Sequence, residues 1–150
     1  MAITQAMATS FKTGILNGLH AFGTSVVRAG TGADTFKIAL YTSSATLDAT
    51  TTAYTTSNEV VGTNYTAGGN TLTISQAPTF TSTTAWLDFA DSTWATSTIT
   101  ARGALIYNDT SSGNLAVGVL DFGSDKTSTA GNFSIIFPAG DSTSAIIRIS

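Results

Sequence analysis

The chain has 150 residues, of which 42% are hydrophobic and only 10% are charged, and its formal net charge is −3. This composition excludes the disordered class, which combines low hydrophobicity with high charge, and the scattered basic residues argue against nucleic-acid binding. The absence of cysteine excludes a disulfide framework, a zinc–thiolate site and a thiol nucleophile.

The first predicted element is one helix over residues 6–22, which overlaps a terminal arm over residues 1–9. Four large apolar residues recur there at helical spacing: Phe11, Ile15, Leu19 and Phe22. Such a stripe is typical of a helix that packs one face on a core. Gly23 is a suitable residue to end this helix.

After a Gly-rich joint over residues 28–34, the apolar spacing changes to two, which indicates strands with one buried face. In residues 35–42, Phe36, Ile38 and Leu40 are expected to face the core, and the residues between them to face away. Further strands are predicted in 70–76, 84–91, 97–109 (a short and a longer strand), 114–123, 132–138 and 144–150. The segment "DTSSG" supplies turn residues for a hairpin between the longer strand and its successor.

About eight strands with turn signals at short spacing follow a single helix. This pattern is typical of an antiparallel β-sandwich or jelly roll. We therefore predict one domain over residues 1–150, mainly β, with the sandwich formed by residues 35–150. No apolar run approaches the ~20 residues that a membrane-spanning helix needs, and no secretory signal is recognised.

Residues 48–71, "DATTTAYTTSNEVVGTNYTAGGNT", are rich in threonine and contain only two charged residues. Four larger side chains are spaced through the segment: Tyr54, Val60, Val61 and Tyr65. The segment ends in "AGGN", a turn that needs positive φ angles. We interpret it as an ordered excursion between two strands, held by those four residues, with its threonines outward.

The catalytic and metal-binding chemistry that the sequence permits is sparse. His20 is the single histidine and accompanies no nucleophile motif, so a solvated position on the helix is favoured. The carboxylate pairs Asp88/Asp91 and Asp121/Asp125 match no calcium loop. Capping of turns is favoured for these four residues, and a structural cation is the alternative.

Five aromatic residues are candidates for a sugar-stacking surface: Trp86, Trp94, Tyr54, Tyr65 and Tyr107. Packing in the core and at its rim is the favoured reading, because large aromatic side chains carry much of the burial in a sandwich. The glycines of "TAGGNT" form no phosphate-binding loop. No catalytic, cofactor-binding or metal-binding residue is predicted, and the chain is not expected to be an enzyme.

Five blocks, taken in order, resemble a family of small structural proteins of tailed bacteriophages. These blocks are "FKIALYTSSATLDATTTAYTTSNEV", "YTAGGNTLT", "WLDFADSTW", "TITARGALIYN" and "AVGVLDFGSDKTSTAGNFSIIFP". The likeness extends over nearly the whole chain, from the N-terminal "AITQAMATSFK" to the closing "IIRIS". The resemblance implies a virion component, assembled in the cytoplasm of the bacterial host.

Among virion roles we favour a capsid decoration, or cement, protein that binds the major capsid protein outside the shell. A tail, neck or fibre component is the first alternative, and a carbohydrate-binding module displayed on the particle is the second. A dimer or trimer is expected, because a surface with little charge is a solubility risk for a free monomer. Neither nucleic acid nor membrane is an expected partner.

Two surfaces are predicted to contact the partner. The first is the terminal arm, represented by Ile3, Thr4 and Gln5. The second is the excursion, represented by Tyr54, Glu59, Asn64 and Tyr65. Hydroxyl-rich loops are suited to such contacts, because water-mediated hydrogen bonds form there with little desolvation cost.

Overall fold

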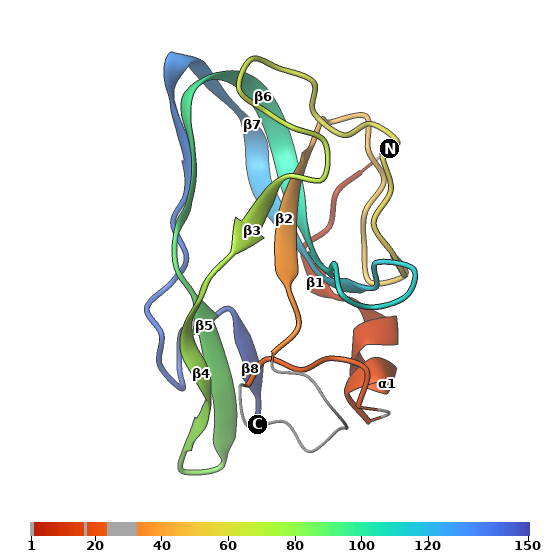
Figure 1. The fold of residues 1–150 in the computed structure, drawn as a ribbon, viewed down its shortest axis with the longest axis vertical. Helices are drawn as coiled ribbons and strands as arrows, with labels where there is room; N and C mark the ends of the chain where they lie inside the picture. Colours follow the sequence, from red (N-terminus) through yellow and green to blue (C-terminus); the bar gives the residue numbers. More distant parts are fainter. Residues whose placement is uncertain (1, 17, 24–32) are drawn as a thin grey trace.

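A computed structural model describes residues 2–16, 18–23 and 33–150, without the side chains of residues 12–14 and 16. In chain order its elements are β1 (Ala6–Met7), α1 (Thr9–Leu16), β2 (Phe36–Tyr41), β3 (Asn70–Leu72), β4 (Ile74–Thr81), β5 (Thr84–Phe89), β6 (Ser92–Asn108), β7 (Ala116–Ile135) and β8 (Ile147–Ile149). Figure 1 shows the long axis of the domain, with α1 and the β4–β5 hairpin in its lower half.

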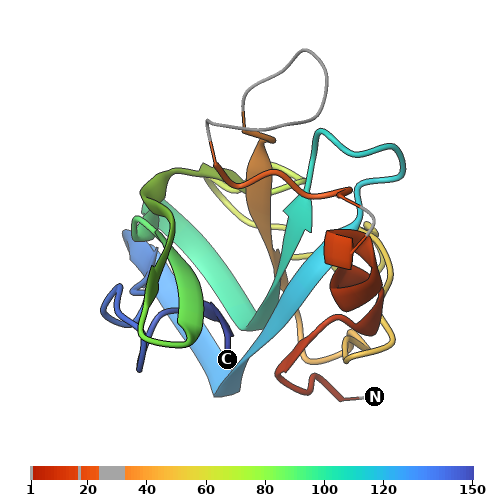
Figure 2. The same cartoon turned by 90° about the horizontal axis from the view of Figure 1, so that it is seen from below.

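The strands form two antiparallel sheets, as the sequence predicted for a mainly β, sandwich-like domain. One sheet has the order β1-β7-β6-β2-β3 and the other has the order β4-β5-β8. Seen from below in Figure 2, β4 and β5 (green) with the C-terminal β8 (dark blue) form one wall of the domain. The predicted strand over residues 70–76 is divided between the two sheets, because β3 ends at Leu72 and β4 begins at Ile74.

β6 and β7 form one long hairpin that bends over the top of the domain in Figure 1. The rings of Phe122 and Phe133 lie 6.3 Å apart, although a straight strand would separate these residues by roughly 36 Å. The bend falls at register shifts around Ser97, where Thr96 and Ala130 have positive φ angles of 50° and 47°. Stretches that the sequence divided into four strands are therefore two continuous strands.

The two faces of β2 are both covered, which differs from the predicted half-buried strand. Ala39 and Tyr41 are as completely buried as Phe36, Ile38 and Leu40, with at most 1% of any of these residues exposed. The chain between β2 and β3 packs on the second face, which local alternation does not reveal.

The helix is shorter than the predicted 6–22. β1 pairs with β7, so residues 6–7 are extended rather than helical. The helix ends at Leu16, and Gly18 follows it with a φ of +66°. Residue 17 and most of the Gly-rich joint lie outside the described residues.

The apolar stripe that predicted the helix is divided by this early end. Phe11 and Phe22 reach the core with ring centroids 5.9 Å apart. Leu19 remains 44% exposed, so only part of the stripe packs as the helical spacing predicted.

The predicted terminal arm is part of the fold. Ile3 is 7% exposed and bridges Leu47 in a parallel sense, and the Thr4 amide donates to the Leu47 carbonyl at 2.9 Å. The Ala8 amide donates to Val117 of β7. Residues 2–8 therefore contact their own domain along their length; Met1 lies outside the described residues.

Candidate interaction surface

The segment between β2 and β3, residues 42–69, crosses the domain and contacts three parts of the large sheet. It forms isolated bridges between Tyr41 and Glu59, between Ala53 and Leu115, and between Thr63 and Thr98. The amide of Val60 also donates to the Leu40 carbonyl at 2.9 Å. These bridges show that the excursion predicted over residues 48–71 is ordered. Its last two residues, 70–71, belong to β3, and from here the name excursion covers the whole connection between β2 and β3, residues 42–69.

The carboxylate of Glu59 is the centre of the contacts that hold the excursion. Glu59 is 8% exposed; its Oε2 accepts the Tyr54 hydroxyl proton at 2.6 Å, and its Oε1 accepts from the Tyr65 hydroxyl and the Gly68 amide, both at 2.7 Å. Within residues 33–150, the ion pairs do not include Glu59. Three short hydrogen bonds therefore compensate the buried charge, because bonds to an ionised acceptor are stronger than neutral ones.

The four tyrosines of the chain all contact the excursion or belong to it. The Tyr65 hydroxyl accepts from the Leu40 amide at 2.9 Å, the Tyr41 hydroxyl donates to the Thr55 carbonyl at 2.6 Å, and the Tyr107 hydroxyl donates to the Gly68 carbonyl at 2.8 Å. The Tyr54 and Tyr107 rings stack with centroids 4.7 Å apart. Side chains from both β2 and β6 thus fix the same segment.

Burial raises the pKa of each tyrosine above its usual value of 10, and the Glu59 charge adds to the effect. For Tyr107, burial and the charges of Asp109 and Glu59 raise the pKa to about 12. These hydroxyls therefore remain proton donors well above neutral pH.

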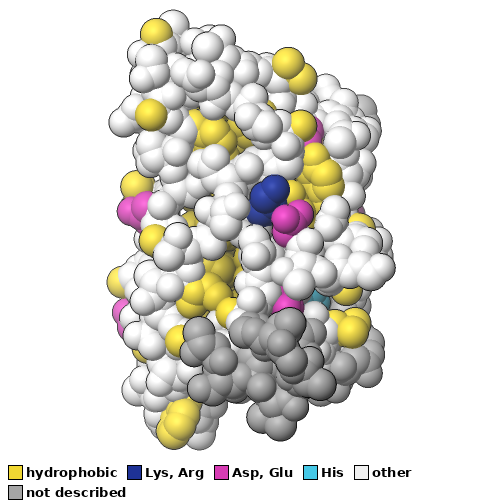
Figure 3. Space-filling view, viewed as in Figure 1, with side chains coloured by type: hydrophobic (Ala, Val, Ile, Leu, Met, Phe, Trp, Pro, Cys, Tyr) yellow, Lys and Arg dark blue, Asp and Glu magenta, His cyan; other side chains and the backbone are white. Residues whose placement is uncertain are grey.

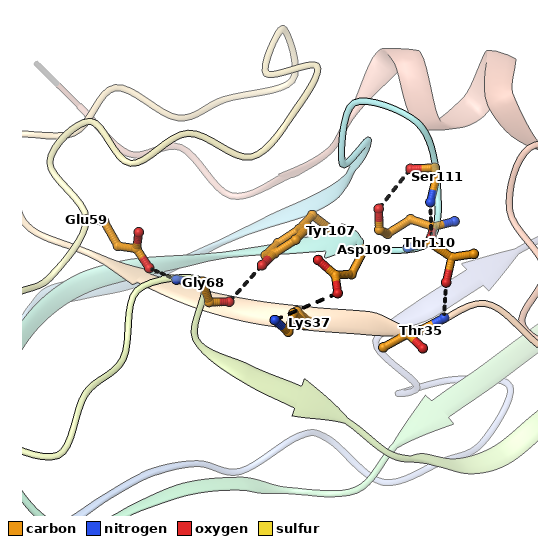
Figure 4. A network of polar contacts seen from close by, with 9 residues as sticks. Thr35, Lys37, Glu59, Gly68, Tyr107, Asp109, Thr110 and Ser111 are labelled. Carbon is orange, nitrogen blue, oxygen red and sulfur yellow. Dashed lines mark hydrogen bonds and ion pairs between the residues drawn. The ribbon is translucent and has the colours of Figure 1, made fainter.

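The contacts around Glu59 continue toward the β6–β7 turn, as Figure 4 shows. Lys37 of β2 pairs with Asp109 at 3.7 Å, and the Thr35 amide donates to the Thr110 hydroxyl at 2.8 Å. Thr110 is held in turn, because its amide donates to the Asn108 side-chain oxygen at 3.0 Å. The hairpin predicted at "DTSSG" is thus confirmed between β6 and β7. Its turn is hydrogen-bonded to Thr35, the residue before β2.

The excursion meets the sheet so closely that glycine is required at its end. A Cβ atom on Gly69 would lie 1.9 Å from the Ile38 carbonyl oxygen, and Gly69 has a φ of +71°. Gly68 also has a positive φ, of +94°. The "AGGN" turn with positive φ angles is therefore confirmed.

Four residues were predicted to hold the excursion on the domain, and the prediction is wrong for one of them. Val60 is buried, but Val61 is 97% exposed. Glu59 and Val60 are adjacent and both buried, so the exposure of Val61 does not follow from alternation along an extended strand. Glu59, which the sequence placed at the surface, takes the interior position together with Tyr54 and Tyr65.

The seven residues predicted to contact a partner separate into two groups. The interior group consists of buried Ile3 and Glu59 and half-buried Tyr54 and Tyr65; Thr4, Gln5 and Asn64 are exposed. The Asn64 side chain donates to the Thr96 carbonyl at 2.9 Å, so it occupies an acceptor at the edge of β6. Contact of the exposed group with a partner stays a prediction.

The excursion presents hydroxyl groups to solvent. Its exposed threonines are Thr46, Thr50, Thr52, Thr55, Thr56, Thr63 and Thr66. Figure 3 shows one face of the domain on which charged side chains are sparse. The surface that the excursion forms is therefore uncharged over most of its extent, apart from Asp48, whose carboxylate accepts from the Thr50 amide at 2.7 Å.

Of the four paired aspartates, only Asp121 caps a local turn, because its carboxylate accepts from the Gly123 amide at 2.9 Å. The other three make long-range contacts, so the predicted capping role is wrong for them: Asp91 accepts from the Phe137 amide at 2.9 Å, Asp88 accepts from the Ser75 hydroxyl at 3.1 Å, and Asp125 pairs with Arg102 at 4.0 Å. The described residues contain no group of three or more His, Cys, Asp or Glu side chains that could hold a metal ion. Among these same residues, no helix has the length and apolarity to cross a membrane.

The remaining candidate side chains pack internally. Trp94 is 4% exposed, with its ring 6.1 Å from that of Phe133, so it presents no face to a sugar; Trp86 is half-buried. His20 lies beyond α1 rather than on it, with its ring 4.8 Å from Phe11 and its Nδ1 3.2 Å from the Asn108 side-chain nitrogen. The solvated helix position predicted for His20 is therefore wrong.

Comparison of the chain with protein-family models, with curated proteins and with solved structures found no match. The proposals below therefore rest on the described geometry and on the resemblance of the sequence blocks.

Proposed function

We propose that this protein is a non-enzymatic structural component of a tailed-bacteriophage virion, and that it decorates and stabilises the capsid. The observation that carries the proposal is the excursion. It is held by a buried carboxylate and four tyrosines, yet its outer surface consists mainly of threonine hydroxyls. The resemblance to small phage structural proteins supplies the setting.

A loop with this internal support suits a docking surface, because little conformational entropy remains to be lost on binding. The outward threonines suit wet contacts with a large protein lattice, since bridging waters bind nearly as favourably as direct hydrogen bonds. The fully exposed Val61 adds one apolar contact at the same surface. Its two neighbours limit its movement, because Val60 is buried and Gly62 lies against the Thr98 carbonyl.

The proposed mechanism is stabilisation by preferential binding. A protein that binds the assembled shell, and not its separated subunits, shifts the equilibrium toward the shell. Repeated weak contacts between copies, as dimers or trimers, and the major capsid protein add through their high effective concentration on the lattice.

The number of copies per particle tests the proposal. Quantitative mass spectrometry of purified particles, relative to the major capsid protein, is expected to find hundreds of copies. Density for the chain is expected on the outer surface of the shell. A count of a handful or dozens would assign the chain to the tail, neck or fibre instead, and absence from the particle would contradict any virion role.

Surface variants test the excursion itself. Val61→Ser and Thr66→Ala, which replace exposed side chains of the excursion, are expected to lower occupancy on the particle. Thr129→Ala, a substitution of an exposed residue on β7, is the matched control. Unchanged occupancy for both excursion variants would place the contact on another face.

A further inference from the structure

The three-stranded sheet has two outer strands, and only one of them has a regular free edge. β4 contains Pro78, which lacks an amide proton, and its pairing with β5 is shifted at two points. β8 pairs with β5 without a shift, through Ala85–Ile149, Trp86–Arg148 and Leu87–Ile147. Within the described residues β8 has no second partner strand, so its outer edge offers unpaired backbone groups.

A cavity of about 230 Å³ lies beside this edge. Its walls are mainly apolar and come from β1, α1, β6, β7 and the start of β8, and they include Met7, Phe11, Ile106, Gly118 and Ile147. We call it the β8 cavity. Ile147 belongs both to the cavity wall and to the free strand, so the backbone edge and the apolar space are contiguous.

Arg148 faces the opposite side of the strand from Ile147 and Ile149, because adjacent side chains of a strand alternate. Its guanidinium donates to the Thr143 carbonyl. In the part of the chain that is described, Arg148 forms no ion pair with a carboxylate. A cationic group with unused donors therefore flanks the same free edge.

We propose that the edge of β8 binds an extended segment of another protein by strand addition. Backbone hydrogen bonds from β8 hold the segment, and one of its apolar side chains enters the β8 cavity. An acidic side chain on its other face pairs with Arg148. In this mode of recognition the backbone supplies affinity and the alternate side chains supply specificity.

A second copy of β8 fits this edge poorly. Pairing all three residues of β8 with another β8 places Arg148 directly opposite Arg148 of the second copy. Like charges in directly opposed positions destabilise a sheet. Charge complementarity therefore favours a foreign strand that carries an acidic residue.

A synthetic ten-residue peptide tests the proposal with the purified full chain. The probe alternates valine and threonine and carries one central aspartate; a control peptide has proline at alternate positions. Calorimetry is expected to detect binding of the first peptide only. Hydrogen exchange is expected to slow at residues 147–149 in the complex. No binding of the probe at millimolar concentration would overturn the proposal.

Two glycines of β7 provide a matched pair of variants. Gly118 pairs with both Met7 and Ile106, and directly paired residues share a face, so a side chain at 118 enters the β8 cavity. An added Cβ meets no atom closer than 3.5 Å at Gly118 or 3.6 Å at Gly131. Gly118→Val is expected to weaken peptide binding at least tenfold, and Gly131→Val to leave it within twofold. Equal affinities would overturn the cavity assignment.

A charge exchange provides a test that does not depend on the cavity. The Arg148→Glu variant is expected to bind the aspartate peptide at least tenfold more weakly than the original protein does. It is expected to bind a matched peptide that carries lysine in place of the aspartate. Sedimentation could instead detect dimers of the protein that dissociate when the peptide is added. Such dimers would show that β8 pairs with a second copy, and they would overturn the choice of a foreign strand. These experiments use no capsid, so their failure leaves the proposed virion function standing.

Discussion

Replacement of Glu59 tests whether the buried carboxylate holds the excursion. In Glu59→Leu, the hydroxyls of Tyr54 and Tyr65 and the Gly68 amide lose their acceptor. An unsatisfied buried polar group costs about 1–3 kcal/mol. The hydrogen bond of the Gly68 amide to Glu59 is buried, whereas those of the two tyrosine hydroxyls are only partly buried. We therefore expect a total loss of about 3 kcal/mol in the free energy of unfolding.

Glu59→Gln separates the charge from the hydrogen-bonding geometry. A glutamine oxygen in the place of Oε1 still accepts from Tyr65 and Gly68, and the Tyr54 hydroxyl can accept from the new amide group. The loss is expected to be about 1 kcal/mol, since hydrogen bonds to charged groups contribute roughly that much more than neutral ones.

Urea unfolding followed by tryptophan fluorescence measures both losses. Hydrogen exchange is expected to accelerate in residues 42–69 of the leucine variant before the rest of the domain responds. Asp48→Asn, which alters the half-buried second carboxylate of the same segment, is the control and is expected to change stability least, because an asparagine oxygen can still accept from the Thr50 amide. If Glu59→Leu unfolds within about 0.5 kcal/mol of the original protein, the range of a neutral surface change, the carboxylate does not hold the excursion.

Three further predictions follow from the same contacts. The tyrosines have a raised pKa in the folded protein, so their contribution to stability is complete below pH 10 and is lost as the pH rises through about 12, the pKa of Tyr107. Absorbance at 295 nm, followed against pH in folded and in urea-unfolded protein, measures the direction of the pKa shift, and identical titration curves would contradict it. Gly69→Ala is expected to destabilise the domain by about 3 kcal/mol, against about 1 kcal/mol for Gly113→Ala, because both have positive φ but only Gly69 would place a Cβ against backbone; equal losses in urea unfolding would contradict the steric argument. Deletion of residues 2–8 removes β1 and a buried isoleucine, so the melting temperature is expected to fall by several degrees; an unchanged value would show that the arm is dispensable.

Local patterns were sufficient for the fold class and for particular turns. The period-two spacing of apolar residues in β2 and β5 predicted the positions of these strands. The spacing arises within each strand, because at least one of its faces is directed to a core. The glycines before β3 predicted the positive-φ turn, and the polar residues after β6 predicted the hairpin. In each case the determining interaction lies within a few residues of the chain.

The interior role of Glu59, the second buried face of β2 and the docking of residues 2–8 were decided by tertiary structure. The three donors to Glu59 lie within nine positions of it, but they are positioned by distant strands, because Tyr65 is bonded to Leu40 of β2 and Gly68 to Tyr107 of β6. Ile3 and Leu47 are 44 positions apart, so no local period connects them. A charged residue in a threonine-rich segment has the pattern of a surface residue until three donors surround it. The alternation of a strand reports only its own two faces, whereas burial depends on which distant segment covers each of them.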